Sequence, residues 1–290
     1  MAKIKLITDA ASDISPEYEK KLGIRVIPFK VAMGDKSYTS GVDFDNEKFY
    51  QMLDEYDGIP ATSQITVFDY EEIFKEYYDK GYTDIINVTI NSEGSATYNN
   101  ACMAANNFFE SCPEAKDRFR IFNIDSEGYT GSYGWPLIQA AEKIKKGIPA
   151  AEIADYISDW VKNSVIYFAM YTLKYARKSG RIPSAAAFVG EVMGLRPVMR
   201  IHDHQIKTHT KVRGDKAVIP KIIDLTCAEI IPQTPYCVVY GRDEKVRDEL
   251  AEALTKKLGY PPADFFQIGA AIAINAGPLV VGAIFKSSRP

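Results

Sequence analysis

The chain has 290 residues, of which 46% are hydrophobic and 25% are charged, and its formal net charge is -3. This length suits one large domain or two ordinary ones, and the composition is that of a globular protein. The small net charge and the scattered basic residues argue against a surface for nucleic acid or an anionic membrane. No apolar run approaches the ~20 residues that span a bilayer, so we expect no transmembrane segment.

The start of the chain and its cysteines bear on the compartment. The N-terminal stretch MAKIKLITDA is too short and too soon acidic for a signal peptide. The four cysteines form no CxxC pair, which is typical of reduced thiols rather than of a disulfide framework. We therefore expect a cytoplasmic protein.

The first half of the sequence predicts alternating strands and helices. Apolar runs predict strands at residues 3–8, 24–33, 84–90 and 118–125. Helical periodicity recurs at residues 46–56, 68–82, 132–147 and 150–161, and another helix follows residue 97. This order predicts an α/β fold with a mainly parallel, Rossmann-like sheet flanked by helices.

The second half mixes hairpins with helices. Residues 165–170 predict a strand, and residues 171–193 predict helix with a break at Ser179–Gly180. Residues 196–214 predict two strands around a turn, and strands and helices alternate beyond them. We therefore predict an N-terminal α/β domain at residues 1–162 and a C-terminal domain with a mixed α+β sheet at residues 163–290. No Gly/Ser/Pro-rich linker separates them, so we expect the two domains to pack together.

The stretch EGSATYNN follows the strand at residues 84–90 and opens a helix. Free N–H groups at the helix start, with the hydroxyls of Ser95 and Thr97, could bind an anion. The alternative is that one hydroxyl only caps the helix, and the pattern alone favours capping. The stretch PATSQIT at residues 60–66 likewise favours a helix N-cap.

Sharper chemistries fail on the same residues. No lysine completes a phosphate loop, no GxGxxG motif is present there, and Ser95 lacks the flanking glycines of a nucleophile elbow. His202 and His204 flank the predicted turn of a hairpin, where we expect them to face solvent. We therefore expect neither a catalytic residue nor a metal site. Arg181 and Arg213 each neighbour a glycine, and each fits a solvated surface charge or an anion contact equally well.

Eight segments taken in order resemble the DegV family of bacterial fatty acid-binding proteins, which includes the lipid-binding subunit of a fatty acid kinase. They are TDAASDI at 8–14, PATSQIT at 60–66, SEGSATYNNA at 92–101, IDSEGYTGSYG at 124–134, TLKYARKSGRIP at 172–183, LRPVM at 195–199, KVRGDKA at 211–217 and NAGPLVVGAIF at 275–285. No single segment is specific, but their order and spacing together are.

The resemblance implies two α/β domains with a buried acyl chain. It implies carboxylate contacts at Thr62, Ser95, Ala96 and Asn275, where Ala96 replaces a family glycine and Asn275 a family histidine. An amide donates a hydrogen bond but cannot become cationic. Arg181 and Arg213 match arginines of the head-group network or of the contact with the partner.

The resemblance also implies a carrier rather than an enzyme. The carrier would bind a long-chain fatty acid without a cofactor and present its carboxylate to an ATP-dependent kinase, which forms the acyl phosphate. It would bind no nucleic acid, and any membrane contact would be transient. Two alternatives stay open at this point: an acyl hydrolase that uses Ser95, and a lipid sensor without a kinase.

Overall fold

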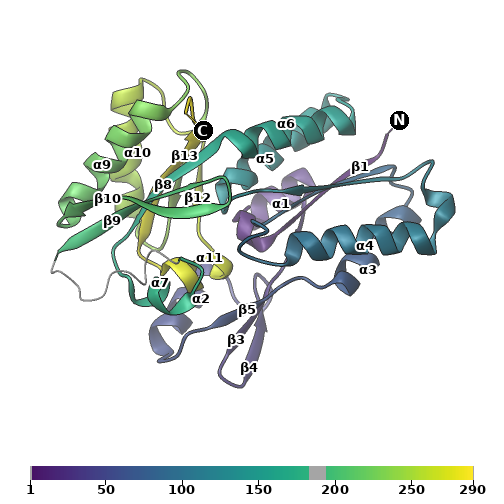
Figure 1. Ribbon diagram of the computed structural model, residues 1–290, viewed down its shortest axis with the longest axis horizontal. Coiled ribbons are helices and arrows are strands. Elements are labelled where there is room, and N and C mark those ends of the chain that lie inside the picture. Colours follow the sequence, from purple (N-terminus) through teal and green to yellow (C-terminus); the bar gives the residue numbers. More distant parts are fainter. Residues whose placement is uncertain (1, 183–193, 290) are drawn as a thin grey trace.

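The computed structural model describes residues 2–182 and 194–289, apart from the side chain of Lys178. Two large sheets share a layer of helices between them (Figure 1). This layer consists of α5 (Gly131–Lys145) and α6 (Ala150–Asn163). Their apolar side chains join one core that contains strand residues of both sheets. The predicted α/β fold class is confirmed.

Four parallel strands form the first sheet. Their order is β2-β1-β6-β7, with bounds Arg25–Ile27, Ile4–Asp9, Asp84–Thr89 and Arg120–Asp125. Helices α3 (Val67–Asp79) and α4 (Thr97–Ser111) cover one face, whereas α1 (Pro16–Leu22), α5 and α6 lie on the other. Every residue of β6 is buried, as its continuous apolar run indicates for a strand covered on both faces.

The strand predicted at residues 24–33 is two strands in different sheets. The first is β2, and the second is β3 (Lys30–Met33), which pairs with β4 (Lys36–Thr39) and β5 (Ala61–Ser63) in a small antiparallel sheet. Pro28 lies at the break, because proline has no N–H for a ladder hydrogen bond.

The predicted helix cap within residues 60–66 is correct only for its last residue. Thr62 lies on β5, opposite Val31. Thr66 is the N-cap of α3, where its hydroxyl accepts from the backbone N–H of Asp69 and the Asp69 carboxylate accepts from that of Thr66. This reciprocal pair is a capping box.

Six strands form the second sheet, in the order β10-β9-β8-β13-β11-β12. They are Gln205–Arg213, Leu195–His202, Ser164–Met170, Val280–Lys286, Tyr236–Tyr240 and Asp264–Gln267. All neighbours are antiparallel except β11 and β12. Alternate residues of β8 face the helical layer or the outer helices α9 (Val218–Glu229) and α10 (Glu244–Leu258). This is the mixed sheet that the second half of the sequence predicts.

Short helices complete the chain: α2 (Asn46–Glu55), α7 (Lys174–Ser179) and α11 (Ala270–Ala276). The predicted break of the 171–193 helix is confirmed at Gly180, which has a positive φ of 69°. The part of that prediction at residues 183–193 lies outside the described residues. The division into domains after residue 162 stays a prediction, and within the described ranges α6 ends where β8 begins. No helix in the described part of the chain is long and apolar enough to cross a bilayer.

Candidate ligand-binding site

A cavity of about 410 Å³ lies where loops of the first sheet meet the second sheet and α11. Its size is in the range of small-molecule sites. Much of its wall is apolar and includes Ile90, Ile166, Phe168, Ile201, Val239 and Val280. Hydroxyl and amide side chains gather elsewhere on the wall, on β5, the loop before α4, and α11. The cavity therefore offers a ligand both apolar contacts and hydrogen-bond donors.

Five of the six predicted site residues line this cavity: Thr62, Ser95, Ala96, Arg181 and Asn275. They come from sequence positions more than 200 residues apart, so the fold brings them together. Arg213 is not among the lining residues, and it lies exposed at the end of β10.

In the loop before α4, several backbone N–H groups donate to acceptors within the same loop. The carbonyl oxygen of Asn91 accepts from the N–H groups of Gly94 at 3.0 Å and Ser95 at 3.1 Å. Within the described residues, the N–H of Ala96 has no such partner. The N–H of Ala96, at the N-cap of α4, is therefore a backbone donor that remains available to the predicted anion site.

A short chain of hydrogen bonds orients the Ser95 hydroxyl. The buried Thr97 Oγ1 accepts from the N–H of Ile65 at 3.4 Å and lies 2.9 Å from Ser95 Oγ. Ser95 Oγ also accepts from the Thr97 N–H at 3.3 Å, but Ser95 precedes the N-cap residue Ala96, and α4 has no side-chain cap, so the capping interpretation is wrong. When the Thr97 hydroxyl donates to Ser95, the Ser95 proton is left to point at a ligand.

The remaining polar side chains have unused donors. Asn275 donates one amide proton to the Ala271 carbonyl at 3.0 Å, which leaves its second proton for the cavity. Thr62 is exposed on β5, and its hydroxyl has no hydrogen bond to a described residue. The Arg181 side chain is exposed at the rim, and its guanidinium forms no ion pair within the described ranges.

Tyr129 is a cavity residue to which the sequence gives no role. Its hydroxyl accepts from Asn91 Nδ2 at 3.2 Å and lies against Gly94. A Cβ at position 94 would come within 2.5 Å of that hydroxyl, so glycine is needed there. Burial raises the pKa of Tyr129, and the positive charge of Arg181 opposes this rise. The sequence shows the loops at residues 92–101 and 124–134 as separate motifs, but the contact between them depends on the fold.

The expectation that His202 and His204 face solvent is wrong. Both are half-buried: His204 contacts loops of the first sheet through Asn91 and Glu127, whereas His202 lies against Ser164 of the neighbouring strand β8. His202 Nδ1 lies 3.1 Å from the Ser164 carbonyl oxygen, and His204 Nδ1 lies 2.9 Å from Asn91 Oδ1. A hairpin tip is polar in many proteins because it is solvated, whereas here His204 at the tip binds a loop of the first sheet.

The geometry around Ser95 gives no support to a hydrolase. Both hydrogen-bond contacts of its hydroxyl within the described residues are with Thr97, and neither provides a general base. A serine nucleophile needs a base within hydrogen-bond reach.

Comparison with known proteins identifies the family. The family model described as "Uncharacterised protein, DegV family" matches residues 3–287. The chain belongs to the DegV family. A DegV domain-containing protein of Caldanaerobacter subterraneus subsp. tengcongensis is 28% identical over 288 residues, which cover 99% of each chain.

Several solved structures have the same fold. One is a stearic acid-binding protein from Eubacterium ventriosum, with a TM-score of 0.86 and 24% identity over 99% of this chain and 98% of that one. Another is DegV, a fatty acid-binding protein from Bacillus subtilis, with a TM-score of 0.82 and 23% identity over 98% of this chain and 99% of that one.

Proposed function

We propose that this protein binds a long-chain fatty acid in the cavity and presents its carboxylate to an ATP-dependent kinase in the cytoplasm. The observation that carries the proposal is a cavity wall that combines many apolar side chains with hydroxyl and amide donors from β5, the loop before α4, and α11. A protein from Eubacterium ventriosum and DegV from Bacillus subtilis, which share this fold, are described as fatty acid-binding, which agrees with this proposal.

The acyl chain supplies most of the affinity. Burial of a CH₂ group contributes about 0.8 kcal/mol, so a chain of about sixteen carbons gives a gross ~12 kcal/mol before ordering costs. Hydrogen bonds to a charged carboxylate add roughly 1.5–3 kcal/mol each. The head-group residues therefore mainly set the depth and orientation of the ligand, and no buried cation is required.

The carboxylate is held by the Ser95 hydroxyl, the Ala96 N–H, the Thr62 hydroxyl and the second amide proton of Asn275. These groups are donors that the protein leaves unused at the polar end of the cavity. Asparagine at position 275 keeps the donor but adds no positive charge. Arg181 stands at the rim, where its guanidinium attracts the carboxylate and the negatively charged phosphates of a bound nucleotide.

The chemical step belongs to the kinase, and this chain contributes binding and orientation. Arg181 and Arg213 are both exposed, as a contact with a partner protein requires. Because Arg213 lies outside the cavity wall, its role is the partner contact rather than the carboxylate.

The ligand proposal is tested with a double variant, Thr62→Ala with Ser95→Ala. Mass spectrometry of lipid extracted from the wild-type protein should find about one fatty acid per chain. The double variant should bind the same fatty acid at least tenfold more weakly, which corresponds to about 1.4 kcal/mol. A matched control is Ser37→Ala with Ser111→Ala, since both hydroxyls are exposed on β4 and α4 and neither lines the cavity. Absence of a fatty acid, or equal affinity in wild type and double variant, would overturn the assignment.

The kinase proposal is tested separately with Arg181→Ala. This change should lower acyl-phosphate formation by the partner kinase and leave the bound fatty acid in place, because the tail dominates affinity. Equal loss of both quantities, or of neither, would contradict the role of Arg181. Fatty acid binding without acyl-phosphate formation by any ATP-dependent kinase would instead indicate a lipid sensor.

A further inference from the structure

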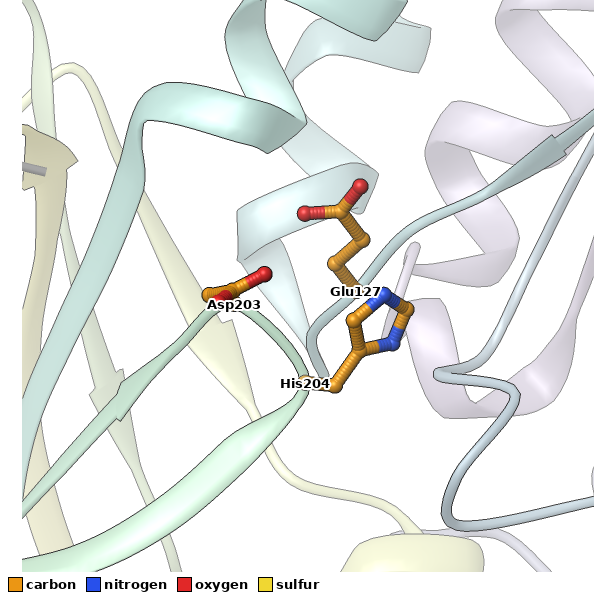
Figure 2. A group of neighbouring side chains, drawn as sticks. All are labelled: Glu127, Asp203 and His204. Atoms are coloured by element: carbon orange, nitrogen blue, oxygen red, sulfur yellow. The ribbon is translucent and has the colours of Figure 1, made fainter.

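A second group of polar side chains lies where the two sheets meet, outside the cavity wall. Glu127 comes from the loop between β7 and α5, and Asp203 and His204 form the turn between β9 and β10. One carboxylate oxygen of each acid and one ring nitrogen of His204 lie within 4.8 Å of one another. Figure 2 shows the three side chains around a common space.

The tautomer of the His204 ring follows from its contact with Asn91, a residue that is not one of the three. Asn91 Oδ1 accepts from the N–H of Glu93 at 3.1 Å, and its Nδ2 donates to the His204 carbonyl at 2.8 Å and to Tyr129 Oη at 3.2 Å. The amide orientation is thereby fixed, and its oxygen faces His204 Nδ1 at 2.9 Å. Nδ1 must therefore carry the proton, and in the neutral ring Nε2 has the free lone pair.

This arrangement is the one that holds a metal-binding histidine. Such histidines donate their other ring N–H to an oxygen of a supporting residue, which fixes both tautomer and ring orientation. The Asp125 carboxylate, 3.8 Å from His204 Nδ1, adds negative charge behind the ring. Asp125 is itself fixed, because its Oδ1 accepts from the N–H groups of Ser92 and Glu127, each at 3.1 Å.

The two acids of the group lack a cationic partner. Within the described residues, neither Glu127 nor Asp203 enters an ion pair or a side-chain hydrogen bond through its carboxylate. Two carboxylates held this close repel each other unless a cation lies between them. The His204 side chain is 25% exposed, so the space is open to ions from solvent but partly shielded from water.

We propose that Glu127, Asp203 and His204 bind one divalent cation, with Zn²⁺ preferred over Mg²⁺ and Ca²⁺. One imidazole nitrogen and two carboxylate oxygens are a ligand set that zinc accepts, with water in a fourth position. Mg²⁺ and Ca²⁺ bind oxygen ligands and gain little from the imidazole. In a tetrahedral zinc site the ligand atoms lie about 3.4 Å apart, so side chains whose ligand atoms are up to 4.8 Å apart must close by as much as roughly 1.4 Å on binding.

The cation connects the two sheets beside the ligand cavity. Tyr129 and Thr130 follow Glu127 closely in the chain, and Ile201 and Ile206 flank the turn, and all four line the cavity. A cation at this point fixes the turn of the second sheet to a loop of the first. Because it binds the folded chain and not the unfolded one, it also stabilises the protein by mass action.

The test uses tag-free protein treated with EDTA and then dialysed. Isothermal titration with Zn²⁺ should give one site per chain with micromolar affinity, and Mg²⁺ should bind at least tenfold more weakly. His204→Gln should weaken zinc binding at least tenfold, and Asp203→Asn and Glu127→Gln should each weaken it severalfold. A rise of Tm on addition of Zn²⁺ should be lost in His204→Gln.

Two controls separate this site from other zinc ligands. His209→Gln changes an exposed histidine of the same hairpin whose ring contacts Tyr167, and it should leave zinc affinity unchanged. All titrations are repeated with Cys227→Ser, which removes an exposed thiol. The proposal is overturned if no zinc binds at 100 µM, or if the affinity is the same in wild type, His204→Gln and Asp203→Asn.

Discussion

Gly94 shows how a single residue shapes the candidate site. A Cβ at this position would lie 2.5 Å from the Tyr129 hydroxyl, well inside contact distance. Gly94→Ala should therefore displace Tyr129 and lower the free energy of unfolding by about 1–3 kcal/mol, as overpacking does. Urea unfolding measures the change.

The double variant Gly94→Ala with Tyr129→Phe tests the cause. Tyr129→Phe removes the clashing hydroxyl and leaves the next ring atom at 3.4 Å. Tyr129→Phe alone loses the bond from Asn91 Nδ2. The double variant should therefore be more stable than the sum of the single effects by at least 1 kcal/mol. Additive effects would show that Gly94 is not required by Tyr129.

Single residues also mark the limit of what sequence can predict. Ser95 is a candidate because a hydroxyl near a helix start either caps the helix or binds an anion, and here it lines the cavity and does not occupy the N-cap position. No sequence pattern points to Tyr129, because its role depends on contacts with Asn91 and Gly94 in another loop. The same holds for Glu127, which is separated from His204 by more than 70 residues.

At the scale of elements, the capping box of α3 lies where the chain passes from β5 of the small sheet to α3, which covers the first large sheet. Thr66 Oγ1 accepts from the Asp69 N–H at 3.2 Å, and Asp69 Oδ2 accepts from the Thr66 N–H at 2.9 Å. Thr66→Ala should lower the free energy of unfolding by about 1 kcal/mol. Ser37→Ala, an exposed hydroxyl without such a bond, should change it by less than about 0.5 kcal/mol. Equal effects in urea unfolding would contradict a stabilising cap.

Periodicity predicted the elements but not all of their partners. The parallel sheet followed from alternating strands and helices, since parallel strands need long crossovers. The prediction of extended chain at residues 24–33 is correct, but the pattern of apolar residues could not show that the chain breaks at Pro28 and that its two halves join different sheets. The hairpin of β9 and β10 was predicted with its turn, whereas the loop that receives the turn could not be.

For the whole molecule, the central fact is one helical layer shared by two sheets. The core of this layer includes residues of both sheets, so the sheets do not pack as separate bodies. A polar contact adds to this joint: Asp13 Oδ1, after β1, accepts from the Gly269 N–H at the start of α11, at 2.8 Å. The helix that carries Asn275 is thereby held to the first sheet.

At this joint, the fully buried Asp9 and the half-buried Asp13, whose Oδ2 atom is enclosed, make stability depend on pH. Asp9 is fully buried and accepts from Tyr133 Oη at 2.7 Å and from the Ile90 N–H at 2.6 Å. Burial raises the pKa of Asp9 to about 6. Burial, with a smaller contribution from the charge of Asp9, raises the pKa of Asp13 to about 7. Both values lie above the 3.8 of an unperturbed aspartate, so the folded protein takes up protons before the unfolded chain does.

The free energy of unfolding that these groups contribute should therefore rise as the pH falls from about 8 toward 5. The rise is at most about 1.4 kcal/mol per pH unit and group. Asp13→Asn removes one titrating group and keeps an oxygen for the Gly269 N–H. Relative to this variant, the wild type should gain about 1–2 kcal/mol of stability between pH 8 and pH 5.5, measured by urea unfolding at each pH. A difference between the two proteins that stays constant over this range would mean that Asp13 titrates near its ordinary pKa and that burial at the joint does not govern its charge.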